Sequence, residues 1–108
     1  MTINYEDFSK LDIRIGKIIS AEKILDADKL LKLIIDIGGE ERQVVAGIAE
    51  VFEDPEVLVG KKTPVLVNLE PRKLRGFESQ GMILATSVDG RPVLLRPEEE
   101  VPPGSTVK

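Results

Sequence analysis

The segment from Asn68 to Met82 contains the side chains of this protein that are best suited to binding a ligand. Three cations, Arg72, Lys73 and Arg75, lie within it, although the chain of 108 residues has a net charge of -4. The residues Ser79–Met82 then provide short polar side chains and a glycine. Because cations neutralise phosphates and short polar groups hydrogen-bond riboses and bases, this composition suits an RNA contact surface. The simpler alternative is a solvated strand end followed by a tight turn.

Composition excludes most catalytic and metal-binding chemistry. The chain contains neither His nor Cys, so it lacks the usual general base, the commonest metal ligand and any thiolate or disulfide. Ser79 therefore has no His partner, and nothing indicates that Lys73 is desolvated enough to activate it. Asp26 and Asp28 have the spacing that begins a calcium loop, but leucines follow where further ligands are needed. We expect no catalytic site, no cofactor and no metal site.

The length and the net negative charge of the chain indicate a single acidic domain, residues 1–108. No apolar run approaches the roughly 20 residues of a membrane span, and the N-terminal segment lacks the features of a signal peptide. We therefore expect a cytoplasmic protein without membrane contact. Much of the acidity is concentrated in Glu50–Glu56 and Glu98–Glu100, so a modest basic face elsewhere is compatible with the negative net charge.

Strand patterns dominate the elements that must position the candidate residues. A short helix, capped by Asn4, is predicted to run to about Lys10. The predicted strands cover residues 11–21, 31–37, 42–48, 64–69, 82–88 and 93–95. Gly38 and Gly39 indicate a hairpin between the second and third strands. Residues 49–59 predict a short helix or two turns, broken near Pro55.

This order of elements predicts an all-β protein. The fold with a crossover helix between its third and fourth strands is the OB-fold, a five-stranded Greek-key barrel. Gly16 interrupts the first strand, as a small barrel needs where one strand serves two sheets. A β-sandwich is the alternative, but about seven strands are expected in that architecture.

Such a barrel brings separate cations to one face. Lys29 and Lys32 belong to the connection between the first two strands, whereas residues 72–82 belong to the connection between the fourth and fifth strands. These connections border the binding face of an OB-fold. The chain has only one Tyr and three Phe, so it is poor in the aromatic platforms that stack single-stranded bases. Folded RNA, contacted through riboses and phosphates, suits the surface better.

The chain resembles a known family, the tRNA-binding domain that is appended to methionyl-tRNA synthetases and also occurs as free-standing proteins. The matching segments run through almost the whole chain in order: Lys10–Arg14 with Gly16, Ala27–Lys32, Val45–Ile48, Asn68–Leu74, Glu78–Met82 and Val101–Gly104. The resemblance implies an OB-fold that binds the outer corner of tRNA by its structure more than by its sequence. The implied contacts are Lys29, Lys32, Arg42, Asn68, Lys73, Ser79, Gln80 and Met82. We add Arg72 for its charge, and for Met82 the strand pattern alone favours a core position instead.

The resemblance also implies partners. Because Met1 stands directly before the domain, we expect the free-standing form, similar to a β-subunit that assists the catalytic subunit of a methionyl-tRNA synthetase. The resemblance implies a homodimer, and the candidates for its interface are Tyr5, Phe8 and Pro102-Pro103. The alternative is the related dimeric protein-export chaperone of the same fold, which binds unfolded polypeptide. The segments Ala27–Leu30 and Ser79–Met82, which that chaperone lacks, favour tRNA.

Overall fold

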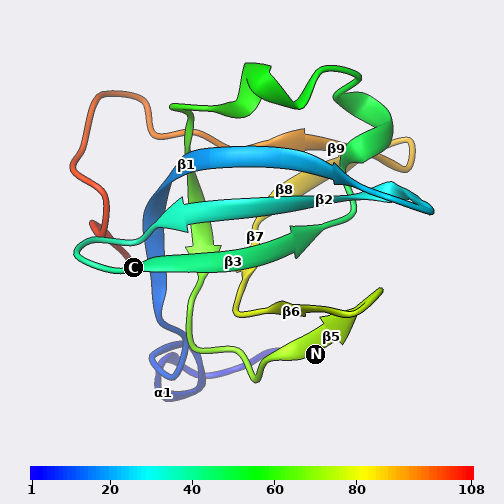
Figure 1. Ribbon diagram of the computed structural model, residues 1–108. Coiled ribbons are helices and arrows are strands. Elements are labelled where there is room, and N and C mark those ends of the chain that lie inside the picture. Colours follow the sequence, from blue (N-terminus) through cyan, green and yellow to red (C-terminus); the bar gives the residue numbers. More distant parts are fainter.

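The computed structural model describes residues 1–108, and strands make up nearly all of its regular structure (Figure 1). The elements are α1 (Tyr5–Phe8), β1 (Ile13–Ile24), β2 (Ala27–Asp36), β3 (Glu41–Ala46), the 3-10 helices η1 (Ala49–Val51) and η2 (Pro55–Leu58), β4 (Lys62–Leu66), β5 (Arg72–Leu74), β6 (Phe77–Ser79), β7 (Met82–Ile83), β8 (Ala85–Val88), β9 (Arg91–Leu94) and β10 (Thr106–Val107). The main sheet has the order β3-β2-β1-β4-β7, with β10 also paired to β1. The predicted all-β class is confirmed.

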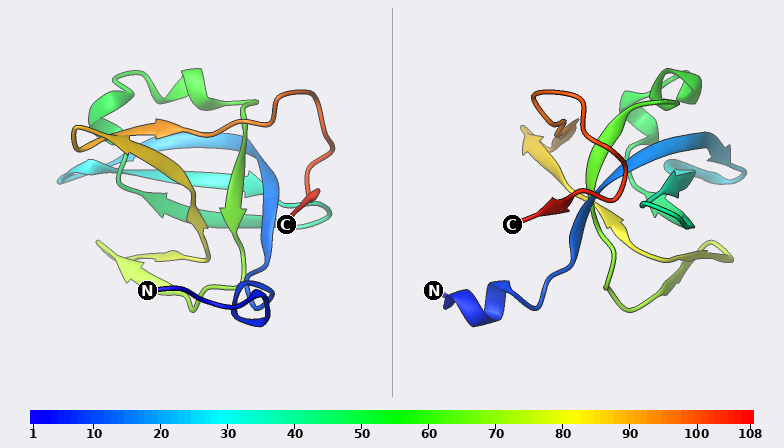
Figure 2. Two further views of the ribbon diagram at one scale, coloured as in Figure 1. Left: turned by 180° about the vertical axis from the view of Figure 1, so that it is seen from behind. Right: turned by 90° about the vertical axis from the view of Figure 1, so that its left-hand side faces the viewer.

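Strand β1 bends sharply and serves two partners, as Figures 1 and 2 show. Its second half pairs with β2, from Lys17 onward, and its first half pairs with β4, up to Lys17. Gly16 lies at the bend, where an added Cβ would come within 2.4 Å of Ile35 Cγ2 and 3.0 Å of Val65 Cγ2. The bend that the sequence predicts at Gly16 is confirmed, and a glycine is required there because no side chain fits.

The core lies inside the curved sheet and is filled by alternate residues of the strands. Leu31, Leu33 and Ile35 of β2 are fully buried, which matches the period of two in the sequence. Leu58 of η2 is also fully buried and covers one end of this core. The structure contains no helix with the length and hydrophobicity that a membrane-spanning segment requires.

The sheet path begins at β3 and ends at β7, and no regular ladder joins these two strands. A single backbone hydrogen bond bridges them just before β7, from the Gln80 amide to the Gln43 carbonyl at 2.8 Å. The sheet is thus open between β3 and β7, and we call this opening the seam. A partly open barrel is the form in which OB-folds occur.

The segment between the third and fourth strands contains two separate 3-10 helices, η1 and η2, which agrees with the predicted alternative of two turns broken near Pro55. Two other local predictions need correction. The predicted strand 82–88 is interrupted at Leu84, because the Leu84 amide donates to the Pro64 carbonyl while β8 turns away to pair with β9. The predicted connection between the fourth and fifth strands contains a hairpin of its own, β5–β6.

Candidate nucleic-acid interface

Hairpin β5–β6 presents the three cations of the Asn68–Met82 segment. Its two-residue turn consists of Arg75 and Gly76, whose φ angles of 51° and 84° are both positive. Two positive φ angles define a type I′ turn, which matches the twist of the flanking strands. Arg72, Lys73 and Arg75 are all exposed. The hairpin therefore holds its cations on a defined backbone rather than on a mobile loop.

The hairpin is anchored by apolar contacts. Leu74 and Phe77 are paired across it and pack on a small cluster of Ile24, Ala27 and Val45. Because neighbouring side chains of a strand point to opposite faces, Lys73 stands on the outward face, whereas Arg72 lies on the anchored face. Lys73 and Arg72 therefore point to opposite faces of the hairpin.

Lys32 joins strand β2 to this hairpin. Its Nζ atom lies 5.2 Å from the centre of the Phe77 ring, close enough for a cation–π contact. The same atom lies 2.8 Å from a carboxylate oxygen of Glu22, so its charge is partly neutralised. The structure brings Lys32 and the hairpin together, but Lys32 and Lys29 lie within β2 and not in the connection before it, where the sequence predicted them.

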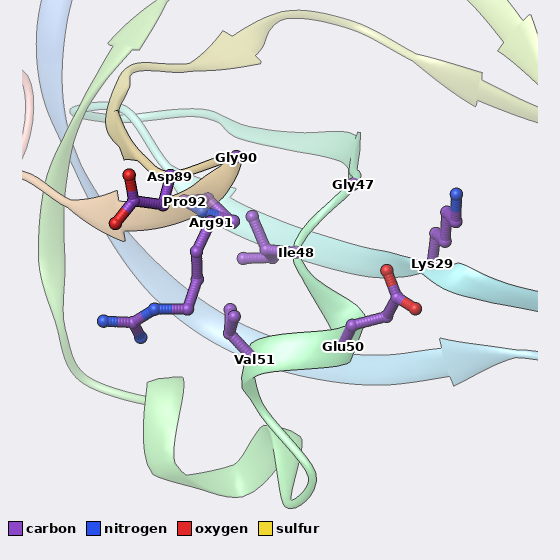
Figure 3. Close-up of a pocket in the computed structure, with 9 residues that line it drawn as sticks. All are labelled: Lys29, Gly47, Ile48, Glu50, Val51, Asp89, Gly90, Arg91 and Pro92. Carbon is purple, nitrogen blue, oxygen red and sulfur yellow. The ribbon is translucent and has the colours of Figure 1, made fainter.

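Lys29 is exposed and makes no ion pair within the chain. It borders an open pocket of about 390 Å³ that is also lined by residues of Gly47–Val51 and Asp89–Pro92 (Figure 3). Lys29 and Arg91 lie on opposite sides of this pocket in Figure 3. Lys29 is therefore a cation without an ion pair at the start of β2, on the side that faces this pocket.

Ser79 and Gln80 close the seam. The Ser79 hydroxyl accepts from the Val45 amide and donates to the Gly81 carbonyl, both at 3.0 Å, and the residue is only 4% exposed. Gln80 Oε1 accepts from the Gln43 amide at 3.1 Å, which leaves its Nε2 group without an intramolecular hydrogen bond. These side chains take the place of missing ladder bonds on β3, whose amides otherwise lack partners at this edge.

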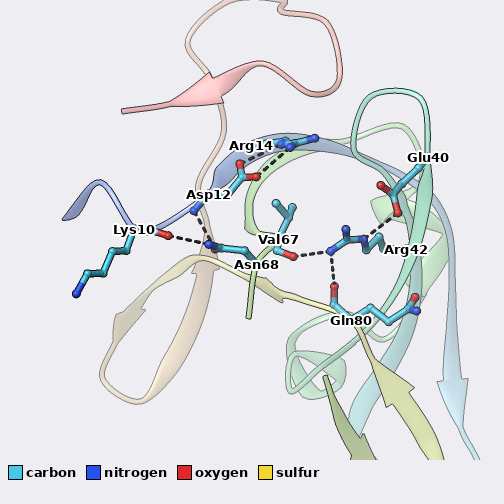
Figure 4. A network of polar contacts seen from close by, with 8 residues as sticks. All are labelled: Lys10, Asp12, Arg14, Glu40, Arg42, Val67, Asn68 and Gln80. Carbon is cyan, nitrogen blue, oxygen red and sulfur yellow. Dashed lines mark hydrogen bonds and ion pairs between the residues drawn. The ribbon is translucent and has the colours of Figure 1, made fainter. Parts of the chain in front are cut away.

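Arg42 and Asn68 belong to a polar network at the ends of β1 and β4 (Figure 4). Arg42 donates to the carbonyl oxygens of Val67 and Gln80 and contacts the Glu40 carboxylate at 3.2 Å. Asn68 Oδ1 accepts from the Asp12 amide at 2.9 Å, and Nδ2 donates to the Lys10 carbonyl at 2.7 Å. Both side chains therefore join segments that are far apart in sequence.

The same network contains the one clear pKa shift of the protein. Arg14 donates two hydrogen bonds to the Asp12 carboxylate, at 3.0 and 2.9 Å. This hydrogen bonding and the negative charge of Asp12 raise the pKa of the Arg14 guanidinium. Arg14 therefore stays charged and keeps Asp12 in place beside Asn68.

Met82 is 45% exposed, so the strand pattern that favours a core position is wrong for this residue. Its side chain borders an apolar groove of about 410 Å³ along the seam. Val45–Ile48 form one wall and Ile83–Ala85 form the other, with Arg72 at the edge. An apolar groove beside a cation offers both an apolar contact and a charge to one ligand.

The predicted residues thus divide into two groups. Four direct their functional groups outward, Lys29, Arg72, Lys73 and Met82, whereas Lys32 is half-buried and held by Glu22 and Phe77. Four are engaged in hydrogen bonds within the fold: Arg42, Asn68, Ser79 and Gln80. Sequence reasoning missed Phe77 as the anchor of the hairpin. The pair Arg75-Gly76 between Leu74 and Phe77 is a hairpin signal that identifies it.

The chain is similar in sequence to a known protein family and to segments of larger proteins. Residues 13–106 match the model of a family described as putative tRNA binding domain. The chain is 59% identical to methionine–tRNA ligase of Archaeoglobus fulgidus over 105 residues, which are 97% of this chain and 16% of that protein. It is 53% identical to methionine–tRNA ligase of Flavobacterium johnsoniae over 106 residues, which are 97% of this chain and 15% of that protein. The chain thus spans about one sixth of the length of these ligases.

Two solved structures are similar to this chain over its whole length. A protein of Pyrococcus horikoshii described as MetRS related has a TM-score of 0.93 and 42% identity, covering 100% of this chain and 99% of that one. The chaperone CsaA of Bacillus anthracis has a TM-score of 0.90 and 34% identity, with 100% of both chains covered. Both comparisons span the barrel and the seam together with the termini. The chain belongs to the family of putative tRNA-binding domains.

Proposed function

We propose that this chain binds folded tRNA through hairpin β5–β6 and the adjoining start of β2. The observation that supports this best is the set of exposed cations held on an anchored hairpin, in a chain of the tRNA-binding family. Lys73 and Arg75 meet phosphates from the outward face of the hairpin, and Lys29 extends this contact along β2. The apolar contacts of Leu74 and Phe77 fix the cations in advance, which lowers the entropy that binding must overcome.

The remaining predicted residues take two roles in this proposal. Met82 and Arg72 contact a ribose or base at the seam groove, and the free Nε2 group of Gln80 is a further hydrogen-bond donor on the seam. Ser79, Asn68 and Arg42 are positioning residues, because their polar groups already bond to the protein backbone. Lys32 has a mixed role, since Glu22 and Phe77 hold it in place.

We infer further that the domain is a non-catalytic accessory to a methionyl-tRNA synthetase. The support is its likeness to about one sixth of each methionine–tRNA ligase that it matches. A second attachment point for tRNA raises the effective tRNA concentration at a linked catalytic site without forming new contacts there.

The first test replaces Lys73 by Ala. Losing a charge-assisted bond to phosphate should weaken tRNA binding by about 1–2 kcal/mol, or roughly five- to thirtyfold. The measurement is fluorescence anisotropy with a labelled tRNA at several salt concentrations, where the slope of log affinity against log salt should become shallower by about one unit. Lys17→Ala, an exposed lysine of β1 away from the interface, is the matched control. Equal affinity and equal slope in Lys73→Ala and wild type would remove Lys73 from the site.

A second candidate function is chaperoning of unfolded polypeptide. It is favoured by the likeness to the chaperone CsaA and by the apolar seam groove between strand edges that no ladder occupies. The apolar side chains of this groove can contact an unfolded polypeptide. Binding assays with tRNA, linear single-stranded RNA and a permanently unfolded protein, run in parallel, separate the two functions. Preference for the unfolded protein would favour the chaperone.

We also propose that two copies associate through their N-terminal segments. The side chains of Met1, Ile3 and Tyr5 are 119%, 62% and 79% exposed. Apolar groups gathered on one exposed arm are typical of an interaction surface.

A further inference from the structure

A second basic site lies outside the candidate tRNA interface. Lys61, Arg91 and Arg96 line one open pocket of about 360 Å³, together with Val51, Phe52, Pro92, Val93 and Leu94. The pocket is formed by η1, β9 and the residue before β4, along the top of Figure 1, whereas hairpin β5–β6 lies at the bottom. None of the nine predicted contact residues lines it.

The cations of this pocket have no direct partner. No acidic side chain lines it, and none of its three cations forms an ion pair within the chain. Lys61 and Arg96 also border an adjoining pocket that is lined by Glu98, Glu99 and Glu100, and Glu100 is bound by Lys62 at 3.1 Å. Figure 3 shows the Arg91 side chain extending away from Lys29 and Glu50.

Unpaired cations at one place are unusual in a chain with 19 acidic and 15 basic residues. Like charges that share a site repel one another, and an anion placed between them removes this repulsion. The pocket is therefore electrostatically more favourable with an anion bound than without one.

The pocket also offers an apolar surface beside the cations. Phe52 is half-buried, and Lys61 Nζ lies 5.9 Å from the centre of its ring. Phe52 and Leu94 both pack against the main core, so this surface is fixed. Fixed apolar groups next to arginines suit a ligand with a phosphate at one end and a ribose or base at the other.

We propose that the pocket of Lys61, Arg91 and Arg96 binds a nucleotide phosphate, with the attached ribose or base against Phe52 and Leu94. This deepens the proposed function, on which it rests for the RNA source of the phosphate. The longest dimension of the molecule, 40 Å, is little more than one helical turn of a nucleic-acid duplex, about 34–36 Å. A folded RNA can therefore occupy both sites at once, whereas a mononucleotide occupies this pocket alone.

The test uses the double variant Arg91→Gln and Arg96→Gln of the full chain. Both side chains are exposed and unpaired, so the fold should be retained, and thermal unfolding checks this. Against tRNA, affinity at low salt should fall about tenfold, and the salt slope should become shallower by about one to two units. The control, Lys17→Gln with Lys108→Gln, removes the same charge from exposed positions outside both sites.

A second arm identifies the source of the phosphate. Adenosine monophosphate is titrated into the wild type while the NMR signals of Phe52 and Leu94 are followed. Signals that shift in the wild type but not in the double variant support a free nucleotide, and an altered tRNA slope in the variant supports RNA. If the variant changes neither, the proposal is overturned. If the wild type does not bind tRNA at all, the proposed function fails, and the nucleotide arm still decides on this pocket.

Discussion

At the scale of single residues, the polar side chains of the candidate interface serve the fold as much as any ligand. Ser79 completes the seam, and Asn68 joins the segment before β1 to the end of β4. Removing such a residue disturbs the backbone that carries the exposed cations. A loss of tRNA binding after its mutation therefore does not by itself demonstrate contact with RNA.

Replacement of Ser79 by Ala tests this positioning role. The Val45 amide would lose its hydrogen-bond acceptor in a buried place, which should reduce the free energy of unfolding by about 1–3 kcal/mol. Urea unfolding measures the loss, and Ser87→Ala on the exposed strand β8 is the control, expected to be near neutral. A Ser79→Ala variant of full stability that nevertheless binds tRNA weakly would instead assign Ser79 to direct contact.

The residues with the right chemistry for the site could be identified from the sequence, but their hydrogen-bond partners could not. The cluster of cations and the absence of His and Cys are visible in the chain itself. The bond between Asn68 and Asp12 spans 56 residues, and the bond between Ser79 and Val45 spans 34. Only the folded sheet brings such groups together, so the division into outward-facing and engaged residues needed the structure.

At the scale of elements, the fold depends on the bend of β1. Two ladders leave this strand on either side of Gly16, and Ile35 and Val65 pack directly over that residue. Both neighbours are β-branched and buried, so their side chains have little freedom to move aside. The bend is therefore a point at which added volume is poorly tolerated.

Gly16→Ala should reduce the free energy of unfolding by about 1–3 kcal/mol, because the added methyl group overpacks the core. Gly47→Ala is the matched control, since its nearest neighbour would be 4.0 Å away, the Lys29 carbonyl. Thermal and urea unfolding of both variants make the comparison. If both variants unfold alike, Gly16 is not the packing constraint described above.

Long elements with a clear period were predictable, and short ones were not. The alternation of Leu31, Leu33 and Ile35 identifies β2, and the glycine interruption identifies the bend of β1. Strands β5, β6 and β10 have three, three and two residues, too few to show a period. Their pairing is set by the turn at Arg75-Gly76 and by tertiary contacts with β1.

At the scale of the whole molecule, the exposed N-terminal arm predicts self-association. We expect light scattering to give a mass of twice 11.9 kDa for the wild type. Ile3→Asp with Tyr5→Asp should weaken the dimer at least tenfold, because charges replace apolar groups at the interface. Val88→Asp, at an exposed apolar residue of β8, is the control and should remain dimeric. A wild-type mass of 11.9 kDa, that of one copy, at high protein concentration would contradict the proposed association.

The pairing of β10 with β1 has a consequence for the time course of folding. Ile13 lies opposite Val107, and the Ile15 amide donates to the Ser105 carbonyl at 2.8 Å. This edge of β1 stays without its last partner until the ribosome has released nearly the whole domain. Contacts of such long sequence separation form slowly. During synthesis β1 therefore lacks this partner until Thr106 and Val107 have emerged, and the sheet of the domain is incomplete before that point.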